Sequence, residues 1–188
     1  MPAPTTPADV AAALWKPVMF RAVAAAAFGA LSVFWPAPDA TVLAYAFAGY
    51  LVFSAKAVWD FAQAGVVPSA VRGLLGGAAI AWSLAAVFMV FVPEPGAVAV
   101  AGGVALAVSG LLELYAWLRH RAELVPVRDF LISGGASLGT GAALLAGRGL
   151  DPHGLFGIAG GGAIIVAVFL LIAAFGYRHD ARERAERR

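Results

Sequence analysis

The chain has 188 residues, of which 62% are hydrophobic and only 13% are charged. This composition excludes an ordinary soluble domain and is typical of a protein embedded in a lipid bilayer. The lack of cysteine excludes disulfide bonds and thiolate metal sites. The formal net charge of +2 is small, and no pattern in the sequence indicates binding of phosphate or nucleic acid. Arginine outnumbers lysine, and both alanine and glycine are abundant. This composition favours a bacterial source.

Apolar residues form six runs along the chain. A helix that crosses a hydrocarbon core of roughly 30 Å needs about 20 such residues. In lipid these segments must also satisfy their backbone polar groups internally, which favours helices. The sequence therefore predicts an all-α membrane protein with six transmembrane helices, at residues 18–35, 40–61, 73–92, 97–118, 130–145 and 154–177.

The runs belong to an internal repeat. The stretch at 34–61, FWPAPDATVLAYAFAGYLVFSAKAVWDF, returns 57 residues later at 91–118 as FVPEPGAVAVAGGVALAVSGLLELYAWL. A third copy follows, with Pro152 placed 57 residues after Pro95. We expect three tandem helical hairpins, at about 14–63, 70–118 and 127–177. Because each hairpin contains two spans, we expect an approximate threefold axis along the membrane normal.

Basic residues separate by side. Twelve of the thirteen lie at one set of helix ends, and Arg148 alone lies at the other. By the positive-inside rule, both termini are expected in the cytoplasm and the turns at Pro36, Pro93 and Pro152 outside. We expect residues 1–13 to be a mobile lead-in and residues 178–188 a charged cytoplasmic tail, either an extension of the last helix or a segment that binds anionic lipid or a partner.

Ionisable residues inside the apolar runs are the main candidates for function. Lys56 and Asp60 stand one helical turn apart, so Lys56 either pairs with Asp60 or reaches the membrane interface. Glu113 occupies the repeat position of Lys56 and has no basic neighbour on its own helix. Its expected partners are Lys56 or the inner-end Arg72 and Arg128, and otherwise it must take up a proton.

Other motifs carry less weight. Gly135, Ser137 and Gly139 fit the GxSxG pattern of hydrolases, but they lie within a predicted spanning helix and not at a strand-to-helix elbow. Small residues at four-residue spacing predict close helix contacts within the chain or between copies in a homo-oligomer. They are Ser133, Ser137 and Gly141; Gly135 and Gly139; and Gly157 and Gly161. We expect no catalytic, metal or cofactor site.

The repeat, with WPAPDATVLAYAFAGYLVFSAKAVWDF and VPEPGAVAVAGGVALAVSGLLELYAW as its best copies, resembles the HdeD family of bacterial acid-resistance proteins. The third turn, LLAGRGLDPH, departs from that pattern. The resemblance implies a non-enzymatic protein of the inner membrane that takes part in the response to acid stress, without established catalytic residues. A small transporter or channel, with a polar pathway near Glu113 and Lys56, is the alternative.

Overall fold

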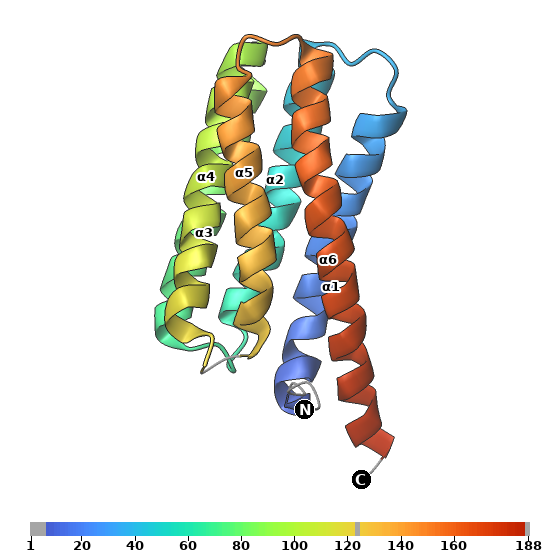
Figure 1. Cartoon of the computed structure of the whole chain (residues 1–188), viewed down its shortest axis with the longest axis vertical. Coiled ribbons are helices and arrows are strands. Elements are labelled where there is room, and N and C mark those ends of the chain that lie inside the picture. Colours follow the sequence, from blue (N-terminus) through green and yellow to red (C-terminus); the bar gives the residue numbers. More distant parts are fainter. Residues whose placement is uncertain (1–6, 123–124, 187–188) are drawn as a thin grey trace.

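The computed structural model describes residues 7–122 and 125–186, and it is helical over almost all of them. Six α-helices run roughly along one direction (Figure 1). They are α1 (Ala8–Phe34), α2 (Ala40–Gln63), α3 (Ser69–Phe91), α4 (Pro95–His120), α5 (Phe130–Ala146) and α6 (Pro152–Glu186), with a short 3-10 helix, η1 (Val125–Asp129), before α5. The predicted all-α class and the number of helices are confirmed.

Each helix packs against the helices before and after it in the chain, and α6 returns to α1. The six helices therefore form a closed bundle in which both ends of the chain lie at the same end (Figure 1). Helices from neighbouring hairpins pack more extensively than the two helices within a hairpin. That alternation is what three hairpins around one axis would produce, and the threefold symmetry itself stays a prediction.

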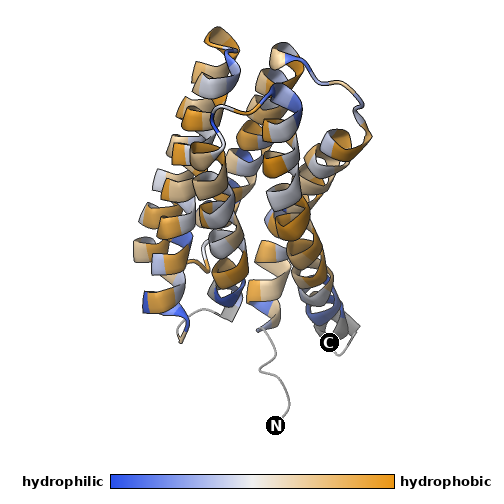
Figure 2. Cartoon of the chain, turned by 45° about the horizontal axis from the view of Figure 1, so that its top comes forward, coloured by the Kyte–Doolittle hydropathy of each residue, from blue (hydrophilic) through white to orange (hydrophobic). Residues whose placement is uncertain are grey.

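The outer surface of the bundle is apolar along most of its length, and polar residues gather near the helix ends (Figure 2). Large apolar side chains are widely exposed, such as Phe34 at 82%, Phe91 at 79% and Leu84 at 66%. Such a surface is unfavourable in water and suited to lipid. Among the described residues, five helices are long and apolar enough to span a membrane, while α5, at 17 residues, is apolar but shorter.

Helix α1 begins ten residues before the predicted run, which corrects the expected lead-in for residues 8–13. Proline is unfavourable inside a helix, yet α1 continues through Pro17. Ala11 and Leu14 are fully buried in the core, and this packing outweighs the backbone bond lost at Pro17. Residues 1–6 of the expected lead-in lie outside the described residues.

The expected charged tail is a continuation of α6, which ends at Glu186. This agrees with one of the two interpretations of residues 178–188, namely an extension of the last helix. Arg187 and Arg188 lie outside the described residues.

The acidic residues of the three turns cap helices. Asp39 accepts a hydrogen bond from the Val42 backbone N–H at 2.8 Å, and Asp151 accepts one from Gly154 at 2.9 Å. Glu94 accepts two, from Gly96 and Ala97, at 2.9 and 2.6 Å. A side-chain acceptor at this position satisfies N–H groups that have no partner within the helix. The acids at the proline turns therefore have a structural role, the same in all three hairpins.

Helices α4 and α5 meet backbone to backbone through glycines. A methyl group on Gly110 would lie 2.6 Å from the Gly134 oxygen, and one on Gly141 would lie 2.6 Å from the Gly103 oxygen. The prediction of close contacts through small residues holds for Gly141, which meets Gly103, whereas the second contact on α5 is made by Gly134, which was not among the predicted residues. At Gly135, Gly139, Gly157 and Gly161 an added methyl group would meet nothing within 4 Å, so the expected contacts there are not formed within the chain.

Candidate functional site

A buried ion pair lies inside the bundle. Arg21, at the middle of α1, places Nη2 2.7 Å from Oε1 of Glu113 on α4. Their side chains are 6% and 0% exposed, so neither charge is solvated by water. A buried charge is costly unless it is paired, so the contact between the two side chains compensates part of the cost of removing both from water.

Ser133 and Trp82 complete this site, which we call the central ion pair. The Ser133 hydroxyl, on α5, donates a hydrogen bond to Oε2 of Glu113. The guanidinium carbon of Arg21 lies 5.0 Å from the centroid of the Trp82 ring on α3, within the range of a cation–π contact. Four of the six helices thus contribute to one charged centre in a core that is mostly apolar.

Close packing of α5 makes the Ser133 contact possible. The residue after Ser133 is Gly134, and a methyl group there would lie 3.0 Å from Cβ of Glu113 and 2.9 Å from the Gly110 oxygen. A larger side chain at Gly134 or Gly110 would separate the two helices. The glycine contact between α4 and α5 therefore sets the distance at which Ser133 can donate to the Glu113 carboxylate.

The polar centre has unused donors. The Nη2 atom of Arg21 is close to Glu113 but poorly aligned for a hydrogen bond, and Nε of Arg21 and Nε1 of Trp82 also find no acceptor among the described residues. Buried polar atoms are usually satisfied. Arg21 also lines a small cavity of about 20 Å³, and Asp129 is another of its lining residues. That space is enough for a single water molecule between polar partners.

The cavity leads toward the end of the bundle that carries both termini. Asp129 is the last residue of η1 and accepts a hydrogen bond from the Tyr177 hydroxyl on α6. Burial raises the pKa of the Asp129 carboxyl above its usual range, and the Tyr177 hydrogen bond offsets part of this. A carboxyl with a raised pKa takes up a proton under milder acid than an exposed aspartate does.

Aromatic rings close the other side of the polar centre. Phe28 lies two turns above Arg21 on α1 and stacks on Tyr50 of α2, with centroids 4.8 Å apart. Phe47 also stacks on the Phe28 ring, with centroids 5.6 Å apart, and Phe156 of α6 meets the Phe28 ring edge-on at 5.4 Å. All four side chains are buried. This aromatic cluster, Phe28, Phe47, Tyr50 and Phe156, fills the core between the central ion pair and the proline turns.

The sequence-based candidates fall into two separate places. Lys56 and Asp60 pair with each other on α2, with side chains 61% and 43% exposed, so one of the two expected interpretations of Lys56 is correct. Lys56 is not the partner of Glu113, and the central ion pair brings in neither Arg72 nor Arg128. Arg72 donates to the Val67 carbonyl at 3.4 Å, and the Arg128 side chain is exposed. Those three expected partners are therefore corrected to Arg21.

Sequence analysis missed Arg21 because it was grouped with the basic residues at inner helix ends. The available signal was its position as the only charge within the run 18–35. The segments before the proline turns repeat at a spacing of 56 residues, one fewer than the segments after them, and this spacing places Arg21 and Ser133 at equivalent positions of the first and third hairpins. Ser137, from the GxSxG pattern, is buried within the continuous helix α5, which is not the setting of a nucleophile elbow.

No family model matches the chain, and no curated protein and no solved structure is significantly similar to it. The resemblance to the HdeD family therefore rests on the sequence pattern alone. Helix length, apolar composition and the exposed apolar surface fit a multi-pass membrane protein.

Proposed function

We propose that this chain is a non-enzymatic, multi-pass membrane protein in which the central ion pair acts as an acid-sensitive lock. The observation that carries this proposal is the full burial of Glu113 against Arg21, joined by Ser133 from a third helix. Protonation of Glu113 would remove the attraction to Arg21 and leave a buried cation without its counter-charge. Acid would thereby loosen the contacts that hold α1, α4 and α5 together.

The surroundings of Glu113 favour a switch over a catalyst. The charged group facing Glu113 is Arg21 on α1, with the Ser133 hydroxyl on α5 and the Tyr50 hydroxyl on α2 within electrostatic range. Glu113 has no exposed surface, so a substrate has no access to its carboxylate, whereas a proton can arrive through one water molecule. Together these features support a residue that responds to acid and does not process a ligand.

Protons would reach Glu113 from the end that carries the termini. On that side, Arg21 and Asp129 line the same small cavity, and Asp129 accepts a hydrogen bond from Tyr177 of α6. On the other side, the aromatic cluster blocks the core. With the positive-inside orientation, the lock would respond to the pH of the cytoplasm. A role in acid resistance at a bacterial inner membrane, suggested by the resemblance to HdeD, is consistent with such a sensor.

The test replaces both residues of the central ion pair together, so that neither is left as an unpaired buried charge. Arg21→Gln combined with Glu113→Gln keeps two polar side chains in contact but removes the group that titrates. In cells that depend on this protein for survival in acid, the double variant is expected to accumulate normally and to lose protection. The matched control is Lys56→Gln with Asp60→Asn, which removes the exposed pair on α2. Full protection by the first double variant would refute the lock.

The transporter or channel alternative is favoured by one observation, the small cavity that Arg21 of the central ion pair and Asp129 both line. A continuous pathway would also require the stacked rings of Phe28 and Tyr50 to separate. Purified protein in liposomes with a pH-sensitive dye inside distinguishes the two functions. If the ion pair acts only as an acid-sensitive lock, the wild type should show no proton flux. Proton flux in the wild type that is absent in Glu113→Gln would establish transport. Lys56 lies on the outer surface of α2, so it would not share that pathway.

A further inference from the structure

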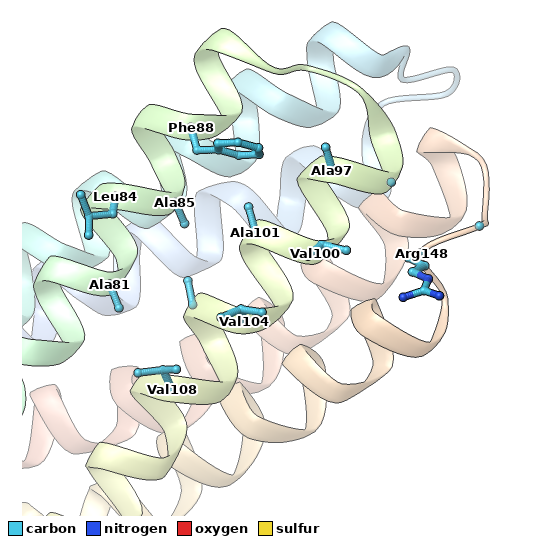
Figure 3. Close-up of a pocket in the computed structure, with 13 residues that line it drawn as sticks. Ala81, Leu84, Ala85, Phe88, Ala97, Val100, Ala101, Val104, Val108 and Arg148 are labelled. Carbon is cyan, nitrogen blue, oxygen red and sulfur yellow. The ribbon is translucent and has the colours of Figure 1, made fainter.

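A long apolar groove runs between α3 and α4 on the outside of the bundle. Figure 3 shows Ala81, Leu84, Ala85 and Phe88 on the α3 wall facing a row from Ala97 to Val108 on α4. Its volume is about 1100 Å³, and Arg148 and Gly149 of the α5–α6 connection lie at its end. Alanines form much of its floor, and the valine and leucine side chains along its edges are exposed.

The groove covers one half of the membrane-spanning length. It reaches from Gly96, at the start of α4, to Val108, which is the middle of that 26-residue helix. Twelve residues of helix rise about 18 Å, close to the depth of one leaflet, which is roughly half of a 30 Å hydrocarbon core. A transmembrane helix from a second copy would cross both leaflets, so the dimensions favour an occupant confined to one leaflet.

The polar end of the groove carries a positive charge. Arg148 is exposed, and it takes part in none of the ion pairs formed among the described residues. Glu94 lies near the Arg148 backbone, since a methyl group on Gly96 would meet both the Glu94 carboxylate and the Arg148 carbonyl oxygen. The two carboxylate oxygens of Glu94 are already engaged by the backbone N–H groups of Gly96 and Ala97. The positive end of the α4 helix therefore offsets the charge of Glu94. Arginine binds phosphate oxygens well, because its planar donors match their geometry.

We propose that this groove binds an anionic phospholipid from the leaflet at the proline turns. One acyl chain lies between α3 and α4 as far as Val108, and the phosphate contacts Arg148. The alanines admit the chain, while Leu84, Phe88 and Val104 form its sides. This inference is independent of the acid-sensitive lock, since it uses none of the residues of the central ion pair.

Native mass spectrometry of the delipidated protein tests the site, with equal amounts of phosphatidylglycerol and phosphatidylcholine of the same chain length. The wild type is expected to retain one molecule of phosphatidylglycerol in preference to phosphatidylcholine. Arg148→Gln should reduce that preference by about tenfold, the effect of one charge-assisted contact. Arg119→Gln, which removes an exposed arginine at the opposite end of the bundle, should leave it unchanged. An equal loss in both variants, or none in Arg148→Gln, would overturn the assignment of the headgroup site.

The chain-binding part of the groove has its own test. Ala101→Phe fills the groove and should remove the retained lipid of either class. Ala142→Phe places the same ring on an exposed position of α5 and should leave lipid retention intact. Two further outcomes contradict the proposal. One is loss of the preference for phosphatidylglycerol when inorganic phosphate is added at the same concentration as the lipid. The other is formation of a disulfide between two chains of the Val104→Cys variant, which would identify the occupant as a second copy.

Discussion

Lys56 and Glu113 stand at the same position of the first two repeats, but the structure gives them opposite environments. The Lys56 side chain is 61% exposed and pairs with Asp60, whereas Glu113 is fully buried and pairs with Arg21. The repeat therefore preserves the position along the helix without preserving which side of the helix faces the core. Within the described part of the chain, this buried charge pair, contributed by two different hairpins, distinguishes the interior of the bundle from a purely apolar one.

Breaking the central ion pair at one partner is expected to destabilise the protein strongly. Glu113→Gln leaves Arg21 buried without its counter-charge, which typically costs about 3–5 kcal/mol. Arg21→Met should have a similar effect, and Arg21→Met together with Glu113→Met should recover most of the loss. The free energy of unfolding, measured by denaturant titration in detergent micelles, checks this. Lys56→Met serves as the control, since an exposed pair contributes about 0–1 kcal/mol. Additive losses in the double variant would contradict the pairing.

The sequence was sufficient for the architecture and insufficient for the site. Apolar run length and the proline turns predicted all six helices, because lipid leaves the backbone few alternatives. The partner of Glu113 depends on which face of α1 turns inward and on how deeply Arg21 lies, and neither follows from local spacing. Glu113 itself was found because its helix offers it no basic neighbour. Ser133 was assigned to a row of small residues, and its hydrogen bond depends on the approach of α5 to α4.

The glycine contact between α4 and α5 is expected to tolerate no added methyl group. Gly110→Ala would bring a carbon to 2.6 Å from backbone atoms of Gly134 and Leu138. The helices would have to separate, with a loss of about 1–3 kcal/mol, as for overpacked cores. Gly135→Ala and Gly139→Ala are the matched controls, since nothing lies within 4 Å of either position. These should leave stability unchanged or raise it by up to about 1 kcal/mol through helix propensity. Thermal unfolding of the purified variants measures both.

The capping role of the turn acids also gives a specific expectation. Asp39→Ala should cost about 0.5–2 kcal/mol, because it removes the acceptor for the Val42 N–H. Asp39→Asn keeps a side-chain oxygen and should cost little. The exposed Asp9, in the first turn of α1, makes no capping hydrogen bond, so Asp9→Ala provides a comparison. Equal losses in Asp39→Ala and Asp39→Asn would show that charge, and not capping, is the important property.

Orientation in the membrane can be measured directly. We expect the proline turns outside and the termini inside, because most basic residues gather at the helix ends on the side of the termini, whereas Arg148 lies at a turn. Ala37→Cys, in the exposed turn between α1 and α2, should react with an impermeant thiol reagent added to intact cells. Gln63→Cys, at the other end of α2, should react only after the cells are opened. The chain has no cysteine of its own, so each label reports one position. The reverse pattern would invert the side from which the lock receives protons.

The last prediction concerns the pH dependence that Asp129 imparts to stability. Burial raises the pKa of its carboxyl in the folded protein, so the folded state holds this proton more tightly than the unfolded state does. The contribution of Asp129 to stability is therefore fully present below its unfolded pKa, near pH ~3.9, and is lost as the pH rises through the higher folded value. Asp129→Asn keeps an oxygen that can accept from the Tyr177 hydroxyl but cannot titrate.

Unfolding free energies of wild type and Asp129→Asn, measured in detergent from pH 4 to pH 7, should consequently diverge. The wild type should lose stability relative to the variant as the pH rises across this range. Asp60→Asn, at an exposed carboxylate on α2, controls for the general effect of removing one negative charge near the same end. Parallel curves for wild type and Asp129→Asn would show that Asp129 does not change its protonation on folding. Such a result would remove it from the proton route to Glu113, while the ion pair with Arg21 would stand on its own evidence.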